Sequence, residues 1–132
     1  MRLLLDTHYA YALAGARGRF STAERDFLAH PPGILVISAV SIWEMRLKWE
    51  SLFAGGARKG PVSPIAAVRV LEAQPLTWLP LLPGHAAAQL ETSLRHQDPF
   101  DELLLLQAQV ETMRLVTRDA RLLDHPLAIV AG

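Results

Sequence analysis

The sequence contains no cysteine among its 132 residues. This absence excludes disulfide frameworks, thiolate zinc sites, iron–sulfur clusters and cysteine nucleophiles. An excess of charge of one sign is also lacking, because 13 Lys and Arg side chains balance 13 Asp and Glu side chains. A large basic surface that binds nucleic acid through charge alone is therefore not expected. Nucleic-acid chemistry in this chain would need a local site, with a metal ion supplying the positive charge.

Long hydrophobic runs are missing as well, so no segment of the sequence is predicted to span a membrane. The apolar run at residues 3–5 is followed at once by Asp6, which makes it too short for the core of a signal peptide. We therefore expect a cytoplasmic protein. Hydrophobic residues nevertheless make up 51% of the chain and charged residues only 20%, which excludes disorder and predicts one folded domain over residues 1–132.

Short apolar runs alternate with stretches of helical spacing along the chain. The runs predict strands over residues 2–6, 34–37, 77–81, 114–117 and 127–130. The spacing predicts helices over about 8–15, 22–29, 39–52, 64–73, 84–95, 99–112 and 119–123. Alternating strands and helices favour an α/β fold of three layers, α/β/α, with helices on both faces of a mostly parallel sheet of four or five short strands.

Acidic side chains recur where predicted strands end. Asp6 closes the first strand, Asp119 follows the fourth, and Glu44 lies on a polar stripe of the helix after the second strand. Parallel sheets bind ligands at the carboxyl ends of their strands, so these acids are expected to converge. Each acid also has a purely structural explanation: Asp6 could start a turn, Asp119 could cap the short helix over 119–123, and Glu44 could form a capping box with Ser41.

A second acidic segment precedes and opens the helix predicted over 99–112. Asp98 suits the N-cap position before Pro99, Asp101 lies on the same helical face, and Glu102 points elsewhere and is expected to be solvated. Asp101 could also act only on the helix dipole. Acids gathered at one sheet edge repel one another, and Mg²⁺ or Mn²⁺, which prefer carboxylate oxygens, would relieve that repulsion.

Four segments resemble, in order and spacing, the acidic motifs of PIN-domain nucleases, above all VapC-type toxins of type II toxin–antitoxin systems. They cover residues 3–8, 37–44, 98–105 with Ala108, and 115–119. The sequence departs from the family at Met113 and Arg114, which replace a glycine-containing turn often seen before the fourth strand. Any one segment is a weak signal, whereas the four in this order are specific.

The resemblance implies a PIN-like fold and a metal-dependent endoribonuclease that hydrolyses RNA phosphodiester bonds with Mg²⁺ or Mn²⁺. It implies an antitoxin partner and, with it, a homodimer. The residues carried over are catalytic and metal-binding Asp6, Glu44, Asp101 and Asp119, a further ligand candidate Asp98, and supporting hydroxyls Thr7 and Ser38.

Two other functions stay open. A haloacid-dehalogenase-like phosphatase also begins with a strand-end aspartate, but it needs a second aspartate where this chain has His8. A non-catalytic module could use the acids only to bind a basic partner.

The helix predicted over 39–52 carries two apolar stripes, of which only one can face the sheet. A neighbouring helix, 8–15 or 64–73, could cover part of the other. We predict that an antitoxin segment packs near Trp49, Leu52 and Phe53, and that the homodimer forms through a separate surface.

Overall fold

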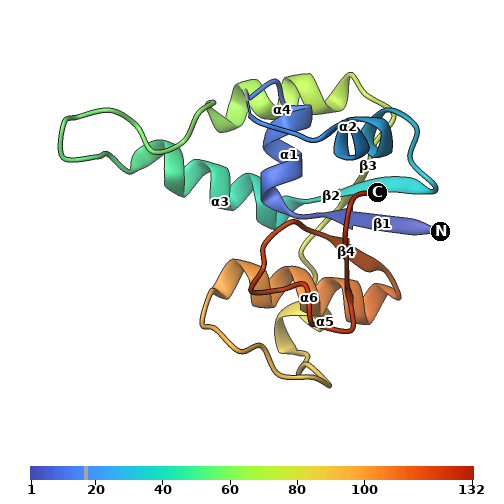
Figure 1. The fold of residues 1–132 in the computed structure, drawn as a ribbon. Helices are drawn as coiled ribbons and strands as arrows, with labels where there is room; N and C mark the ends of the chain where they lie inside the picture. Colours follow the sequence, from blue (N-terminus) through green and yellow to red (C-terminus); the bar gives the residue numbers. More distant parts are fainter. Residues whose placement is uncertain (17) are drawn as a thin grey trace.

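The protein, seen here as a computed structural model that describes residues 1–16 and 18–132, is built around a parallel sheet (Figure 1). Within the described residues the strand order is β3-β2-β1-β4-β5, and every neighbouring pair is parallel. The strands are β1 (Arg2–Leu5), β2 (Ile34–Ser38), β3 (Thr77–Leu79), β4 (Arg114–Val116) and β5 (Ala128–Ile129). The predicted α/β class and parallel sheet are thus confirmed.

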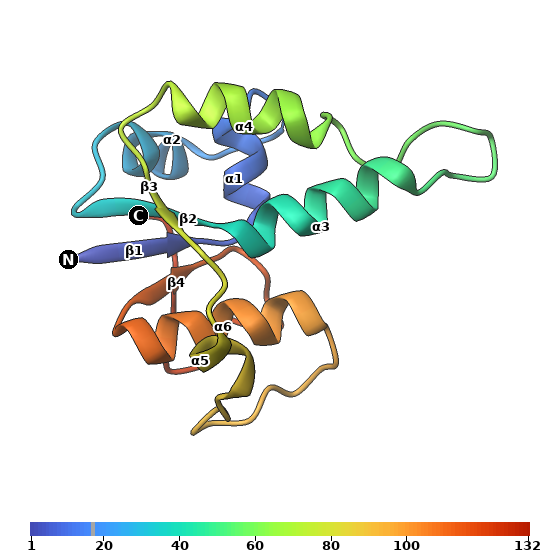
Figure 2. The ribbon, with the colours of Figure 1, turned by 180° about the vertical axis from the view of Figure 1, so that it is seen from behind.

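Helices cover both faces of this sheet. They are α1 (Thr7–Leu13), α2 (Thr22–Ala29), α3 (Ala39–Glu50), α4 (Pro64–Glu72), α5 (Pro83–Ala87) and α6 (Pro99–Glu111). Figures 1 and 2 show α1, α2 and α4 on one side and α5 and α6 on the other, with α3 extending beyond the end of β2. None of the helices in the described part of the chain is long and apolar enough to cross a membrane.

Each face of the sheet has its own apolar core. Leu3 and Leu5 of β1 belong to the core beneath α1 and α4, whereas Leu4 belongs to the core against α6. Adjacent residues of a strand point to opposite faces, so a central strand that is buried on both faces is continuously apolar. The unbroken leucine run of β1 therefore places Asp6, the next residue, at the carboxyl edge of the sheet.

The helix predicted over 84–95 is wrong beyond Ala87, where α5 ends. The backbone that follows is bonded to distant side chains instead of to a helical turn. Gln109 accepts a hydrogen bond from Glu91 N at 2.9 Å and donates one to Gln89 O at 3.0 Å, and the ring of His125 lies 2.9 Å from Thr92 O. These partners lie far along the chain, so local spacing could not reveal them.

The short helix predicted over 119–123 is also wrong. The chain makes a turn there, in which Leu122 N donates to Asp119 O at 2.9 Å. The Asp119 carboxylate accepts the hydrogen bond of Arg121 N at 2.9 Å, as an N-cap residue would, but the residues that follow form turns and not a helix.

The predicted helix starts are mostly confirmed. Ser21 forms a full capping box with Glu24, Ser63 caps α4, and Asp98 caps α6 ahead of Pro99. The proposed capping box at Ser41 is wrong, because α3 already begins at Ala39 with Ser38 as its N-cap. Glu44 is therefore free of a capping role.

The turn before β4, where the sequence lacks the glycine often seen in the family, contains a residue in a left-handed conformation. Thr112 has φ 56° and ψ 50° at the end of α6, and Met113 N then donates to Ala108 O at 2.8 Å. Met113 is buried in the core against α6. The turn is thus made without glycine, at the steric cost that a β-branched residue incurs with positive φ.

Candidate metal centre

A cleft of about 410 Å³ opens at the carboxyl edge of the sheet, between β1 and β4. At this point the chain order reverses, since β2 and β3 lie to one side of β1 and β4 and β5 to the other. Parallel α/β sheets place their ligand crevices at such reversals. Three helices, α1, α3 and α6, the N-cap of α6 and the segments that follow β1 and β4 supply the residues that line the cleft: Asp6, Thr7, His8, Tyr11, Glu44, Lys48, Asp98, Asp101, Arg118, Asp119 and Arg121.

Asp6 forms the floor of the cleft and is 7% exposed. Its Oδ1 accepts the backbone hydrogen bond of His8 at 2.8 Å, which caps α1, and its Oδ2 accepts the hydroxyl hydrogen bond of Thr117 at 2.5 Å. Burial raises the pKa of Asp6 above its ordinary value, although these two hydrogen bonds act in the opposite direction. A buried acid whose anion is destabilised is well suited to accept a cation.

Glu44 approaches the cleft from α3. Its Oε1 accepts the hydroxyl hydrogen bond of Thr7 at 2.7 Å, and its Oε2 forms an ion pair with Lys48 Nζ at 2.9 Å. The hydroxyl of Ser41 is buried and lies 3.0 Å from that of Thr7. The polar stripe that the sequence predicts on this helix thus faces the cleft.

Asp98 and Asp101 lie at the start of α6. Asp98 Oδ1 is occupied by the backbone N–H groups of Phe100 and Asp101, at 2.9 and 3.2 Å. Asp101 Oδ2 lies 2.9 Å from His96 Nε2. Burial raises the pKa of Asp101, and the charges of Asp98 and Asp119 raise it further against the effect of the His96 hydrogen bond.

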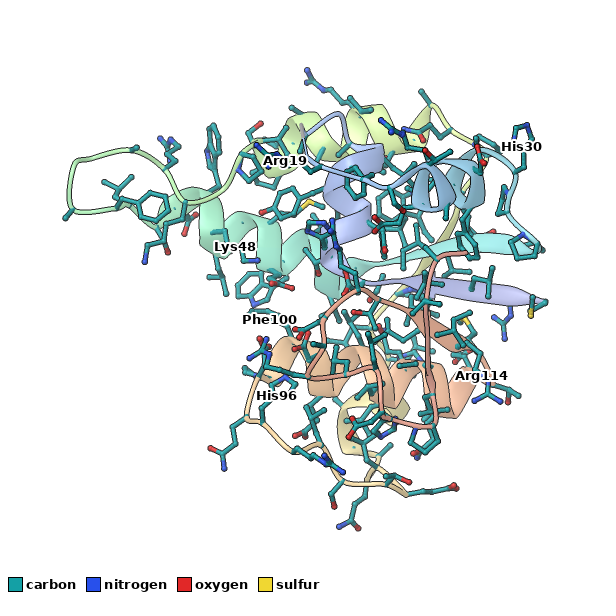
Figure 3. The ribbon with its side chains drawn as sticks, viewed as in Figure 1. Arg19, His30, Lys48, His96, Phe100 and Arg114 are labelled. Atoms are coloured by element: carbon teal, nitrogen blue, oxygen red, sulfur yellow. The ribbon has the colours of Figure 1, made fainter. Side chains whose placement is uncertain are left out.

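A smaller hollow continues from the cleft toward the start of α6 and is lined in part by Lys48, His96 and Phe100. Figure 3 shows these three side chains on the same side of the molecule, whereas His30 and Arg114 lie toward the other end. Lys48 therefore places a positive charge beside the acidic edge.

Asp119 lies just beyond β4 and is bound by the guanidinium of Arg121. Arg121 Nη2 is 2.8 Å from its Oδ2, and Arg121 Nε is 3.2 Å from its Oδ1. These hydrogen bonds lower the pKa of Asp119 below its ordinary value. Its backbone N–H donates to Thr117 Oγ1 at 3.1 Å, so one threonine contacts both strand-end acids.

The structure brings most of the predicted site residues together. The four predicted catalytic acids, Asp98 and Thr7 all line the cleft, while Glu102 is exposed outside it. Ser38 does not line the cleft, because its hydroxyl accepts from Val40 N and donates to Gln107 inside the fold.

The predicted partner residues lie elsewhere. Trp49 is near the end of α3, and Leu52 and Phe53 belong to the loop that projects beyond it in Figure 1.

Sequence reasoning missed three residues whose side chains contact the acids of the cleft, namely Thr117, Arg121 and His96. Thr117 lies two residues before Asp119, a spacing typical of a hydroxyl that accepts from the backbone, and this signal could have been used. Arg121 follows Asp119 at the same spacing and is recognisable as a local ion pair. His96 has no sequence signal, because it lies just past the helix predicted over 84–95, which ends at Ala87 in the structure.

The donor set fits a hard divalent cation, since it consists of carboxylate oxygens at one opening. In the described part of the chain, however, no three acidic or histidine side chains are close enough together to hold an ion as they stand. Two buried polar atoms nearby, Tyr11 Oη and His96 Nδ1, have no hydrogen-bond partner among those residues. The acids thus suit a cation, and some must release their present partners to bind it.

The chain is similar to known proteins in sequence pattern and in fold. The PIN domain family matches residues 3–126. A toxin–antitoxin complex from Klebsiella pneumoniae is similar in structure, with TM-score 0.65, 18% identity and coverage of 98% of both chains. VapBC2 from Rickettsia felis, bound to a DNA fragment from its promoter, gives TM-score 0.59 and 16% identity over 98% of this chain and 97% of that one. No functionally curated protein matches the sequence significantly.

Proposed function

The chain belongs to the PIN-domain family of nucleases, and from that premise we propose that it is a divalent-metal-dependent endoribonuclease. The observation that carries the proposal is the convergence of Asp6, Glu44, Asp101 and Asp119 on one cleft. We further propose that one domain over residues 1–132 acts in the cytoplasm as the toxin of a type II toxin–antitoxin pair. The toxin–antitoxin complexes among the similar structures support this role.

In this proposal the four carboxylates hold Mg²⁺ or Mn²⁺, and Asp98 mainly caps α6 because its Oδ1 is already used by the backbone. When bound, such a cation stabilises charge on a phosphoryl group and lowers the pKa of a coordinated water. Thr117 holds the carboxylate of Asp6, and Thr7 holds that of Glu44, each through a neutral hydroxyl. These hydroxyls orient the acids and leave their charge available.

The test is RNA cleavage by Asp101→Asn beside the matched control Glu102→Gln. Asp101 lines the cleft, and its neighbour Glu102 is exposed outside it on the same turn of α6. With Mg²⁺ or Mn²⁺, we expect the control to cut RNA as the parent does and Asp101→Asn to lose at least about a hundredfold in rate.

Cleavage by Asp101→Asn at the parental rate would show that the assigned site is wrong. A parent that binds the antitoxin and cuts no RNA with either metal would favour the non-catalytic module. A trapped aspartyl-phosphate on Asp6 would favour the phosphatase.

The antitoxin is proposed to pack on the loop that joins α3 and α4. Leu52 and Phe53 are 55% and 57% exposed there, while Trp49 is partly covered by the guanidinium of Arg58 at 4.4 Å from its ring. Exposed apolar side chains on a projecting segment are typical of a partner surface. A basic side chain of the antitoxin would then pair with the cleft carboxylates.

We expect the double variant Trp49→Ala, Phe53→Ala to bind the antitoxin less tightly and to cut RNA normally. The control is Ile34→Ala, which removes a side chain that is 52% exposed at the amino end of β2. Calorimetry with the product of the neighbouring reading frame measures the affinity. Equal affinities for parent and double variant would contradict this placement while the nuclease proposal stands.

A homodimer is proposed through a different face, where α3 and α4 meet β3. Trp43 and Ile65 are 51% and 69% exposed there, and with Trp78 they line an apolar hollow. On the other apolar stripe of α3, Met45 is already buried in the core beneath α1 and α4. Sedimentation of Trp43→Arg is expected to give a monomer where the parent gives a dimer, and a monomeric parent would contradict the proposal.

A further inference from the structure

Arg121 contacts two of the acids to which the proposed function assigns a cation. Its guanidinium makes three hydrogen bonds to Asp119, the shortest of 2.8 Å, and its Nη2 is 3.8 Å from Asp101 Oδ2. Its positive charge therefore lies between the carboxyl edge of β4 and the start of α6. A divalent ion shared by Asp101 and Asp119 would compete for the same oxygens.

The position of Arg121 is set by the local turn and not by burial. Asp119 Oδ1 accepts the Arg121 backbone N–H at 2.9 Å, which turns the chain so that the side chain returns to the acid two residues earlier. The Arg121 side chain is 57% exposed. An exposed ion pair contributes little to stability, so the side chain can leave Asp119 at low cost while the turn persists.

The other basic residues of the cleft are held differently. Arg118 donates to Arg19 O at 2.9 Å and lies 3.6 Å from Glu24, with its guanidinium over the ring of Phe20. Among the residues that the structure describes, Lys48 forms an ion pair with Glu44 only, at 2.9 Å. Within the described residues, Arg121 is the cleft cation whose ion pairs reach two of the proposed ligands.

We propose that Arg121 has two alternative positions, one on Asp119 and Asp101 when no metal is bound and one on a phosphate of the RNA when the metal is bound. Guanidinium groups remain charged at all physiological pH values, so Arg121 cannot yield its place by losing a proton. A divalent cation attracts the two carboxylates more strongly and repels the guanidinium. The displaced side chain remains at the mouth of the cleft, where its fork of N–H donors matches phosphate oxygens.

This inference rests on the proposed function and predicts opposite changes in two affinities. Removing the charge in Arg121→Gln should tighten Mn²⁺ binding, measured by calorimetry without RNA, by about threefold to tenfold, because a competing ion pair is gone. The same substitution should weaken binding of a labelled single-stranded RNA by about tenfold in Ca²⁺, and leave it unchanged in EDTA. Fluorescence anisotropy measures the RNA binding.

The matched control is Arg46→Gln. Arg46 pairs with Glu50 at 3.0 Å on the exposed side of α3 and does not line the cleft, so both affinities should equal those of the parent. Arg121→Lys keeps the charge and loses the fork, and should retain parental Mn²⁺ affinity with weakened RNA binding.

Unchanged or weaker Mn²⁺ binding by Arg121→Gln would overturn the proposed position of Arg121 on the two acids. Unchanged RNA binding in Ca²⁺ would overturn its proposed position on an RNA phosphate. Failure of the proposed function is recognised separately, as a parent protein that neither binds Mn²⁺ nor cuts RNA.

Discussion

The two walls of the cleft hold their acids in different ways. On the wall formed by β1 and α3, Asp6 and Glu44 accept hydrogen bonds from the hydroxyls of Thr117 and Thr7. On the wall formed by α6 and the end of β4, Asp101 and Asp119 are bound by the side chains of His96 and Arg121.

Neutral donors orient a carboxylate and leave its charge for a metal ion, whereas a cationic donor such as the guanidinium of Arg121 competes with that ion. Apart from the ion pair of Glu44 with the half-exposed Lys48, the first wall is thus prepared for binding, and the second must rearrange.

The pKa shifts follow the same division. Burial raises the pKa of Asp6, while hydrogen bonds from Arg121 lower that of Asp119. In the metal-free protein the charge of Asp6 is destabilising and the charge of Asp119 is stabilising. Substitutions on the two walls should therefore have different consequences, which are given below from the largest to the smallest.

The largest effect is expected for Asp6→Asn. Asparagine can still accept the backbone N–H of His8, so α1 keeps its cap, but the buried charge that attracts the cation is lost. RNA cleavage should fall by more than about a hundredfold. The free energy of unfolding without metal should be equal to or greater than that of the parent at neutral pH, because a desolvated anion has been removed.

Quenched-flow or gel assays of cleavage and urea titrations in EDTA check the two parts of this expectation. An Asp6→Asn variant that unfolds would show that Asp6 is mainly structural. A variant that cleaves normally would show that Asp6 does not take part in the reaction. The variant Asp26→Asn, which changes an exposed acid of α2, is the control.

The next effect is expected for Thr117→Val, which removes one hydroxyl without a change of shape. The carboxylate of Asp6 loses its shortest hydrogen bond, so Mn²⁺ affinity should fall by about tenfold to a hundredfold. The loss of a buried hydrogen bond should also cost about 1 kcal/mol of stability. Calorimetry and urea unfolding measure these values. Thr117→Ser should restore both, and a serine variant as defective as valine would argue for a packing role instead.

Thr117 also shows where prediction from sequence ends. The leucines of β1 and the acid that follows them are readable locally, because a buried strand is apolar throughout and ends where a polar residue begins. The contact between Thr117 and Asp6 depends on the register that pairs Leu5 with Val116, which no local pattern encodes. The absence of a helix after Ala87 has the same origin, since Gln109 and His125 bind that backbone from a distance.

A smaller effect is expected in the pH dependence of stability, with opposite signs for the two walls. The pKa of Asp6 is raised from 3.8, so the folded parent holds this proton more tightly and loses stability as pH rises through the raised value. The pKa of Asp119 is lowered from 3.8, so the parent loses stability as pH falls through the lowered value.

Urea titrations in EDTA at several pH values should therefore show Asp6→Asn gaining stability relative to the parent as pH rises above 3.8. Asp119→Asn should lose stability relative to the parent as pH rises from the lowered pKa of Asp119 to about 3.8. Curves that move in the same direction for both variants would contradict the division between the walls.

The smallest effect is expected for Lys48→Gln, which removes the cation that pairs with Glu44 on the first wall. Glu44 keeps the hydroxyl of Thr7 after this change, and Lys48 is half-exposed, so the ion pair adds little to what the threonine already provides. The free energy of unfolding should change by less than about 1 kcal/mol. Mn²⁺ affinity should change less than in Arg121→Gln, because Lys48 contacts one acid and Arg121 contacts two. A larger gain in Mn²⁺ affinity from Lys48→Gln than from Arg121→Gln would reverse the comparison, since the first wall would then also be closed by a cation.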